Sequence, residues 1–298
     1  MAVLCTTARF LPAKVDSEIQ ILSSTTPKFG LHRSTSIYSK PKIRLKFCCR
    51  NSGDNKQTAV VDFSLLESDP PWENGSVWSN MGLYIFSLHI PLSFGGLSVV
   101  AHLLNQPDLE PQIKAVALLV IETLELFGAL LLLEFTTKHK PVSFFQIGKM
   151  RSERSWMVTA VLGFGVLVIA MFFTSFLADK LVDTKGVNNH IVKEILLSGS
   201  VSQSACALVY CIIAPLLEEI VYRRFLLTSL ASSMKWQQAV MISSLIFSAA
   251  HLSSENFIQL VIVGIVLGCS YCWSGDLRSS ILLHSMYNAL TLVITVLA

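Results

Sequence analysis

Pro215-Leu216-Leu217-Glu218-Glu219-Ile220-Val221-Tyr222-Arg223-Arg224 is the stretch that decides the fold of this 298-residue chain. Its two adjacent glutamates interrupt an apolar run that begins at Ala205 and resumes from Phe225 to Leu230. A helix that crosses a bilayer needs about 20 mostly apolar residues, which places both carboxylates within a membrane helix. Ionised groups are costly there, so an intramembrane carboxylate is a candidate functional group by default.

Helical geometry predicts different roles for the two glutamates. Residues four apart share a helix face, so Glu219 faces the same way as Arg223 and is expected to form a structural ion pair with it. Glu218 shares its face with Tyr222, has no cation four residues on, and is therefore the carboxylate free to react. The alternative is that both glutamates only pair with Arg223 and Arg224 and hold helices together.

The composition predicts an all-α protein, a polytopic bundle of transmembrane helices for which the lipid bilayer is a partner. Hydrophobic residues make up 52% of the chain and charged residues only 14%, whereas roughly a quarter of the residues in an ordinary soluble domain are charged. The apolar runs predict about seven spans. We place them at about 82–104, 113–135, 156–178, 203–230, 237–252, 257–273 and 280–297.

The first 50 residues have the composition of an organelle targeting segment. They contain nine Lys or Arg residues, two acidic residues and many Ser and Thr residues, and they lack the apolar core of a secretory signal. We therefore expect a disordered transit peptide over 1–50 and a polar linker over 51–80. The Ser and Thr content favours a chloroplast membrane, envelope or thylakoid, over a mitochondrion. A disordered basic tail on a non-organellar protein is the alternative, and neither interpretation predicts a nucleic-acid surface.

The charges of two connecting loops predict how the helices are oriented. The loop 138–154 holds five Lys or Arg residues and one acid, whereas the loop 105–112 holds two acids and no basic residue. By the positive-inside rule, the loop 138–154 faces the side of synthesis or import, which is the stroma in a plastid. Seven spans would then place the N-terminus in the stroma and the C-terminus on the opposite side.

The second predicted span carries a further pair of carboxylates. Glu122 and Glu125 lie three residues apart on one helix face, and no histidine occurs in that span. Intramembrane carboxylates are functional candidates, but a buried pairing role is the favoured interpretation here. His89 and His102 lie near the two ends of the first span, where we expect hydrogen-bonded or interfacial histidines rather than catalytic ones.

Two later spans contain polar side chains that complete a candidate site. His251 ends the fifth span, and His284 and Asn288 lie four residues apart in the seventh, which places them on one face. Polar residues of membrane bundles usually face inward, so these groups are expected to converge with Glu218 on one pocket. Glutamate and histidine can deprotonate a water, and histidine and asparagine can donate hydrogen bonds to an oxyanion. The predicted chemistry is peptide hydrolysis by general-base catalysis.

Three short motifs, taken in order, resemble those of the CAAX protease and bacteriocin-processing (CPBP) family. They are Glu-Glu-x-x-x-Arg (Glu218, Glu219, Arg223), Phe-x-x-x-His (Phe247, His251) and His-x-x-x-Asn (His284, Asn288). Each motif is weak alone, but all three occur in order and each lies in an apolar helix. The resemblance covers roughly 155–298, the expected protease domain, and leaves 81–154 as two additional helices and a basic loop.

The resemblance implies an all-helical intramembrane glutamic endopeptidase that acts on a protein or peptide substrate without a metal or other cofactor. It implies that Glu218 and His251 activate a water, and that His284 and Asn288 form the oxyanion hole. The positions with a supporting role are Glu219, Arg223 and Phe247. Two alternatives stay open: a zinc-dependent peptidase with the histidines and a carboxylate as ligands, and a catalytically silent membrane scaffold or protein-stabilising partner of the same fold.

Overall fold

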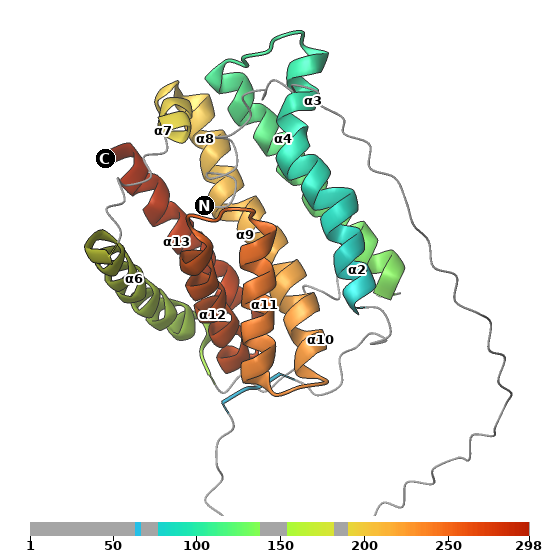
Figure 1. Cartoon of the computed structure of the whole chain (residues 1–298), viewed down its shortest axis with the longest axis vertical. Coiled ribbons are helices and arrows are strands. Elements are labelled where there is room, and N and C mark those ends of the chain that lie inside the picture. The colour runs from blue at the N-terminus through green and yellow to red at the C-terminus, as the bar shows by residue number, and fades with distance from the viewer. Residues whose placement is uncertain (1–62, 67–76, 138–153, 182–189, 298) are drawn as a thin grey trace, which may run out of the picture. The chain divides into compact units, whose positions relative to one another are not determined.

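The computed structural model describes residues 63–66, 77–137, 154–181 and 190–297, in which every regular element is a helix (Figure 1). The all-α prediction is confirmed, while the predicted transit peptide, 1–50, lies outside the described residues. In chain order the helices, with η marking a π-helical segment, are α2 (Val77–Tyr84), η2 (Ile85–Phe94), α3 (Gly95–Leu103), α4 (Pro111–Thr137), α6 (Trp156–Leu181), α7 (His190–Leu197), α8 (Ser200–Leu208), η3 (Val209–Ile213), α9 (Ala214–Glu218), η4 (Glu219–Leu227), α10 (Thr228–Ala231), α11 (Trp236–Ala250), α12 (Phe257–Ser274) and α13 (Leu277–Leu297).

Six helical segments in the described part of the chain are long and apolar enough to cross a membrane. The stretch 237–252, expected as a further span, forms the 15-residue α11. At 1.5 Å per residue this helix is about 22 Å long, shorter than a hydrocarbon core of about 30 Å. The turn from α11 to α12 therefore lies part-way along the bundle, and α13 and α8 extend beyond it (Figure 1). The six segments are Val77–Leu103, Pro111–Thr137, Trp156–Thr174, Ser200–Ala231, Phe257–Ser274 and Leu277–Leu297.

Two of these spans combine α-helical and π-helical turns. The first span contains η2, which includes Pro91, and the span Ser200–Ala231 contains η3 and η4 on either side of Pro215. Proline removes an amide hydrogen and disturbs the regular α-helical bonding, and π-helical turns occur frequently at functional sites. The two adjacent glutamates lie where α9 ends and η4 begins.

The centre of the bundle is formed by η4, α11, α12 and α13. Leu226 and Leu267 are fully buried there. α11 and α12 approach closely at Gly264, where an added Cβ would lie 2.9 Å from Ser244 Cβ, because small residues allow such contact between membrane helices. α6 packs against α12 and α13 (Figure 1) and exposes apolar side chains such as Phe172, as expected for a helix that faces lipid.

The short segment 63–66 packs on the end of the bundle where α11 begins and α12 ends. Phe63 stacks on Trp236, with 4.4 Å between the ring centroids, and Leu65 N–H donates to Cys272 O (2.9 Å). The guanidinium of Arg154 donates to Phe63 O (2.9 Å). These contacts tie the chain that precedes the first span to the pair formed by α11 and α12.

Candidate active site

The site is built around Glu218, the last residue of α9. His251 follows directly after α11, and its Nε2 lies 3.9 Å from Glu218 Oε2. His284 on α13 approaches the same oxygen, with its Nε2 at 3.7 Å. The structure therefore brings together three of the predicted residues: His251 and His284 both approach one carboxylate oxygen of Glu218.

The side chain of Glu218 is largely enclosed by neighbouring residues, but one of its carboxylate oxygens forms no hydrogen bond. Its side chain is 13% exposed, and its Oε2 has no hydrogen-bond partner among the described residues. Distances of 3.7–3.9 Å to the two histidines are too long for direct hydrogen bonds and are of the kind that a water can bridge. The geometry thus fits a small molecule held between the carboxylate and the imidazoles.

Glu219 contacts the other nitrogen of the same imidazole. His284 Nδ1 lies 2.9 Å from Glu219 Oε1, and a carboxylate in that position fixes both the hydrogen on Nδ1 and the orientation of the ring. As a result, His284 presents Nε2 toward Glu218. The two adjacent glutamates therefore have different contacts: Glu219 orients His284, and Glu218 faces the space between the two histidines.

Glu219 also pairs with Arg223, as the spacing of four residues predicts. Arg223 Nη1 lies 3.1 Å from Glu219 Oε1, and both side chains are almost fully buried. Arg223 Nη2 donates to Gly264 O (3.4 Å), and the guanidinium lies over the Phe247 ring, 4.4 Å from its centroid. The cation is thus held by an anion, a backbone carbonyl of α12 and an aromatic face.

Phe247 packs beside both histidines. Its ring centroid lies 4.5 Å from that of His251 and 6.2 Å from that of His284, and Tyr222 meets it edge-on at 5.3 Å. The residue is one turn before His251 on α11 and is only 1% exposed. Packing of this kind restricts the rotamers of the two imidazoles.

Asn288 lies one turn beyond His284 on α13, but its hydrogen bond is to η3 and not to Glu218. Its Nδ2 donates to Tyr210 O (2.8 Å), while its Oδ1 is buried without a partner among the described residues. Tyr210 lies in η3, and the amide that would bond its carbonyl in π-helical register belongs to Pro215, which has no hydrogen to donate. One amide hydrogen of Asn288 is therefore used, which leaves the second for a ligand.

A second polar cluster joins the first two spans. Glu125 Oε1 accepts from Tyr84 Oη (2.7 Å) and lies 2.8 Å from His89 Nδ1. Glu125 Oε2 accepts from Ser93 Oγ (2.6 Å). The buried pairing role expected for Glu125 is therefore found, with a partner in the preceding span. Glu122, on the same face, is buried and its Oε1 has no partner in the described part of the chain.

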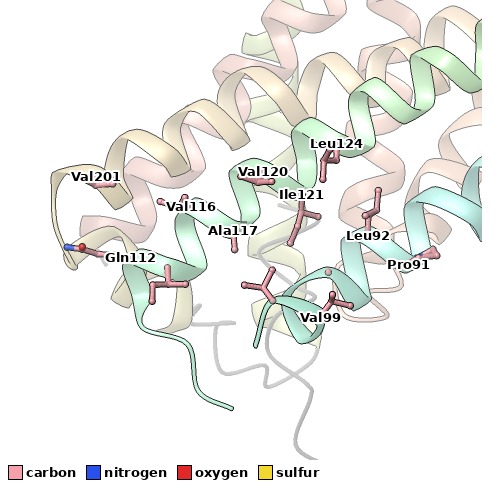
Figure 2. A pocket seen from close by; sticks show the side chains of 13 residues that line it. Pro91, Leu92, Val99, Gln112, Val116, Ala117, Val120, Ile121, Leu124 and Val201 are labelled. Atoms are coloured by element: carbon pink, nitrogen blue, oxygen red, sulfur yellow. The ribbon is translucent and has the colours of Figure 1, made fainter. Parts of the chain in front are cut away.

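A cavity in the described part of the chain lies away from these polar groups. It has a volume of about 760 Å³ and lies between η2, α3, α4 and α8, as Figure 2 shows. Its wall is apolar apart from Gln112, and residues such as Val99, Val120 and Val201 are more than half exposed. A groove of this composition on a membrane helix bundle has no group for chemistry, so it does not compete with Glu218 as the candidate site.

Comparison with known proteins identifies the region that carries the site. A family model described as type II CAAX prenyl endopeptidase, Rce1-like, matches residues 200–290, which include Glu218, His251, His284 and Asn288. Residues 200–290 are therefore similar to the Rce1-like family. This is a family of peptidases, and the three motifs quoted above all lie within the matched residues.

One relative of the Rce1-like segment is the membrane-embedded CAAX protease MroQ of Staphylococcus aureus (strain USA300). The two are 26% identical over 145 residues, which is 46% of this chain and 58% of MroQ. The chain thus matches little more than half the length of this relative. No solved structure matches the chain. The Rce1-like match begins at α8, so the cluster around Glu125 lies outside it.

Proposed function

We propose that the chain is an intramembrane endopeptidase in which Glu218 is the general base for a nucleophilic water. The observation that supports this most directly is the approach of two Nε2 atoms, from His251 and His284, to one oxygen of Glu218 at 3.9 and 3.7 Å. A water about 2.8 Å from each of these atoms would satisfy the buried carboxylate oxygen and both rings. The match of residues 200–290 to a family of peptidases supports the same reaction.

The proposed reaction needs no covalent enzyme intermediate. The water oxygen attacks the carbonyl carbon of the scissile peptide bond while Glu218 takes one of its protons. The carbonyl oxygen becomes an oxyanion, which hydrogen-bond donors stabilise in a site shielded from bulk water. The C–N bond then breaks, and the proton held by Glu218 passes to the leaving amine, so that a carboxylic acid and an amine are released and the carboxylate is restored.

The remaining site residues divide the other tasks. His251 faces the same oxygen of Glu218 and would orient the water with it. His284 would donate to the oxyanion from Nε2 as an imidazolium, whose Nδ1 hydrogen is accepted by Glu219, and the second amide hydrogen of Asn288 would donate beside it. Arg223 and Phe247 support these groups through the ion pair and the ring packing described above. Glu219 is unsuited to act as the base, because it is fully buried and already holds Arg223 and His284.

The proposed substrate is a protein or peptide segment that reaches the site from the membrane. MroQ is named as a CAAX protease, and a C-terminal segment is accordingly one substrate class to test here, beside N-terminal segments of imported proteins. The basic, acid-poor composition of 1–50 supports a chloroplast membrane as the location. A reporter fused to residues 1–50 should enter plastids, and its appearance in the secretory pathway would overturn that part of the proposal.

The decisive variant is Glu218→Gln, which keeps the size of the side chain and removes the base. Terminal peptides should be compared between a null line and lines rescued by wild type, by Glu218→Gln and by Glu194→Gln, an exposed carboxylate on α7 that serves as the matched control. We expect wild type and Glu194→Gln to restore the same cleaved termini and Glu218→Gln to restore none. If Glu218→Gln restores them at equal abundance of protein, the general-base assignment is wrong.

The same experiment tests the scaffold alternative, and metal analysis tests the zinc alternative. If the chain is a silent scaffold, the Glu218→Gln protein should rescue the null line in full. A zinc-dependent peptidase would contain stoichiometric metal and lose activity with chelator. Within the described residues no group of three or more His, Cys, Asp or Glu side chains is arranged to hold a metal ion. Metal analysis of the purified protein, with and without chelator, is the direct test.

A further inference from the structure

His89 links the first span to the end of α11, immediately before His251. Its Nε2 lies 3.2 Å from the carbonyl oxygen of Ala250, and its Nδ1 lies 2.8 Å from Glu125 Oε1. A carbonyl oxygen can only accept, so the hydrogen of this contact is on Nε2 and His89 is the donor. The residues in contact are 161 positions apart in the chain, and neither His89 nor Glu125 lies in the Rce1-like match.

The carbonyl that His89 binds is one of those that a helix leaves without an internal partner at its C-terminal end. α11 ends with the amides of His251 and Leu252 bonded back to Ser248 O and Ala249 O. Ala250 O is the next carbonyl along the chain and is bonded by His89 instead. Leu252 then adopts a left-handed conformation with φ of 48°, which is costly for a non-glycine residue and persists only where surrounding contacts hold it.

Glu125 fixes the orientation of the His89 ring. Its Oε1 lies 2.8 Å from Nδ1 and accepts from Tyr84 Oη (2.7 Å). Its Oε2 accepts from Ser93 Oγ (2.6 Å), one turn after His89. Tyr84 also stacks beside the His89 ring, with 5.7 Å between the centroids. With its carboxylate bonded on both oxygens, Glu125 leaves the ring one arrangement, in which Nε2 points at α11.

We propose that His89, oriented by Glu125, is a positioning residue that fixes the C-terminal end of α11 and so holds His251 against Glu218. The inference rests on the proposed function, because it assigns His89 an effect on turnover through His251. It also assigns the first two spans a part in the site, which the family match does not. His89 does not itself contact the proposed water; its effect is transmitted through one backbone carbonyl.

The test compares His89→Phe, which keeps a ring and removes both contacts, with His89→Gln, whose amide nitrogen can still donate to Ala250 O. His102→Gln, at the exposed end of the same span, is the matched control. Hydrogen exchange of full-length protein in detergent micelles reports the contact without reference to catalysis. In His89→Phe the amides of His251 and Leu252 should exchange about tenfold faster, as expected when a hydrogen bond that caps the helix is lost. Exchange in α12 should be unchanged, and His89→Gln should restore protection.

Kinetics on a peptide identified by the terminal-peptide comparison report the consequence. His89→Phe should lower kcat by about 10²-fold per folded molecule, because a displacement of about 1 Å at a reacting group costs about that much. KM should stay within about twofold, and His89→Gln should recover most of the rate. If His89→Phe does not fold, His89→Asn replaces it, because asparagine can meet Glu125 but is too short to reach Ala250 O.

Three results would overturn the inference: unchanged exchange at 251–252, faster exchange in every helix alike, or altered exchange there with an unaltered kcat. A change confined to KM would also contradict it, since it would place His89 in the substrate path. A failure of the proposed function looks different, because wild type and Glu218→Gln would then cleave the peptide equally, or neither would cleave it. The exchange comparison would still decide whether His89 holds the end of α11.

Discussion

Replacing Glu219 by glutamine should separate the two adjacent carboxylates experimentally. Glu219 is fully buried and serves two groups: Arg223 Nη1 at 3.1 Å and His284 Nδ1 at 2.9 Å. Glu219→Gln keeps the shape of the side chain but removes the negative charge. The guanidinium of Arg223, which is 1% exposed, would then be a buried cation without a counter-ion among the contacts described for it.

The expected loss in the free energy of unfolding depends on the contacts that Arg223 retains in the variant. Breaking a buried pair by removing one partner costs about 3–5 kcal/mol, because the remaining charge is uncompensated. Arg223 retains Gly264 O at 3.4 Å and the face of Phe247 at 4.4 Å, and a desolvated cation–π contact offsets up to about 2 kcal/mol. Glutamine also still accepts one hydrogen bond. We therefore expect a loss near the lower limit, about 3 kcal/mol in the free energy of unfolding.

Catalysis should fall as well, for a separate reason. The neutral amide of glutamine no longer supplies the negative charge that favours the imidazolium form of His284, so donation from Nε2 to the oxyanion is weakened. Loss of one oxyanion donor costs about 10²–10³-fold in rate. Glu219→Gln should therefore lose both stability and turnover per folded molecule, whereas Glu218→Gln should lose turnover alone.

The assay is reversible unfolding in mixed detergent micelles, followed by tryptophan fluorescence, beside a turnover measurement corrected for folded protein. Glu218→Gln should unfold within about 1 kcal/mol of wild type, because the Oε2 of Glu218 has no hydrogen bond to lose. The double variant Glu219→Gln/Arg223→Met should be more stable than Glu219→Gln, since apolar replacements of buried pairs are often tolerated. A Glu219→Gln protein as stable as wild type would refute the buried-pair argument.

Two further predictions concern positions at which the structure gives a definite contact. Asn288→Ala should lower kcat by about 10²–10³-fold, as expected for one oxyanion donor, and a wild-type kcat per folded molecule would remove Asn288 from that role. Gly264→Ala should lower the free energy of unfolding by about 1–3 kcal/mol through overpacking, because the added Cβ would lie 2.9 Å from Ser244 Cβ and 3.0 Å from its Cα. Gly165→Ala, where an added Cβ meets nothing within 4 Å, is the control and should unfold like wild type.

The division between Glu218 and Glu219 could be anticipated from sequence because it depends on local geometry. Spacing by four residues brings Arg223 to Glu219, at 3.1 Å in the structure, and brings no cation to Glu218. The bond between Glu219 and His284 could not be anticipated in the same way. It joins residues 65 positions apart and depends on how α13 packs against η4, for which spacing within one helix gives no information.

The hydrogen-bond partner of Glu125 likewise could not be predicted from spacing within one helix. The second span contains no histidine, so the sequence predicted a buried pair without identifying the group that completes it. The partner is His89, 36 positions earlier. A usable signal was present, because His89 and Ser93 are four residues apart and so present two hydrogen-bonding groups on one face of the first span. Only packing between the two spans shows that this face meets Glu125. The predicted span 237–252 corresponds to α11, which ends at Ala250, but a helix of 15 residues is too short to be one of the six membrane spans.

The π-helical turn after Glu218 explains how two neighbouring carboxylates can serve one imidazole. Adjacent side chains in an α-helix diverge by about 100°, which would direct Glu218 and Glu219 to different neighbours. Hydrogen bonds from i to i+5 widen the turn to more than four residues, so adjacent side chains diverge less. Glu218, at the end of α9, and Glu219, at the start of η4, then reach opposite nitrogens of His284, at 3.7 and 2.9 Å. Glu219 is therefore not a second base: it fixes the ring of His284, whose Nε2 faces Glu218.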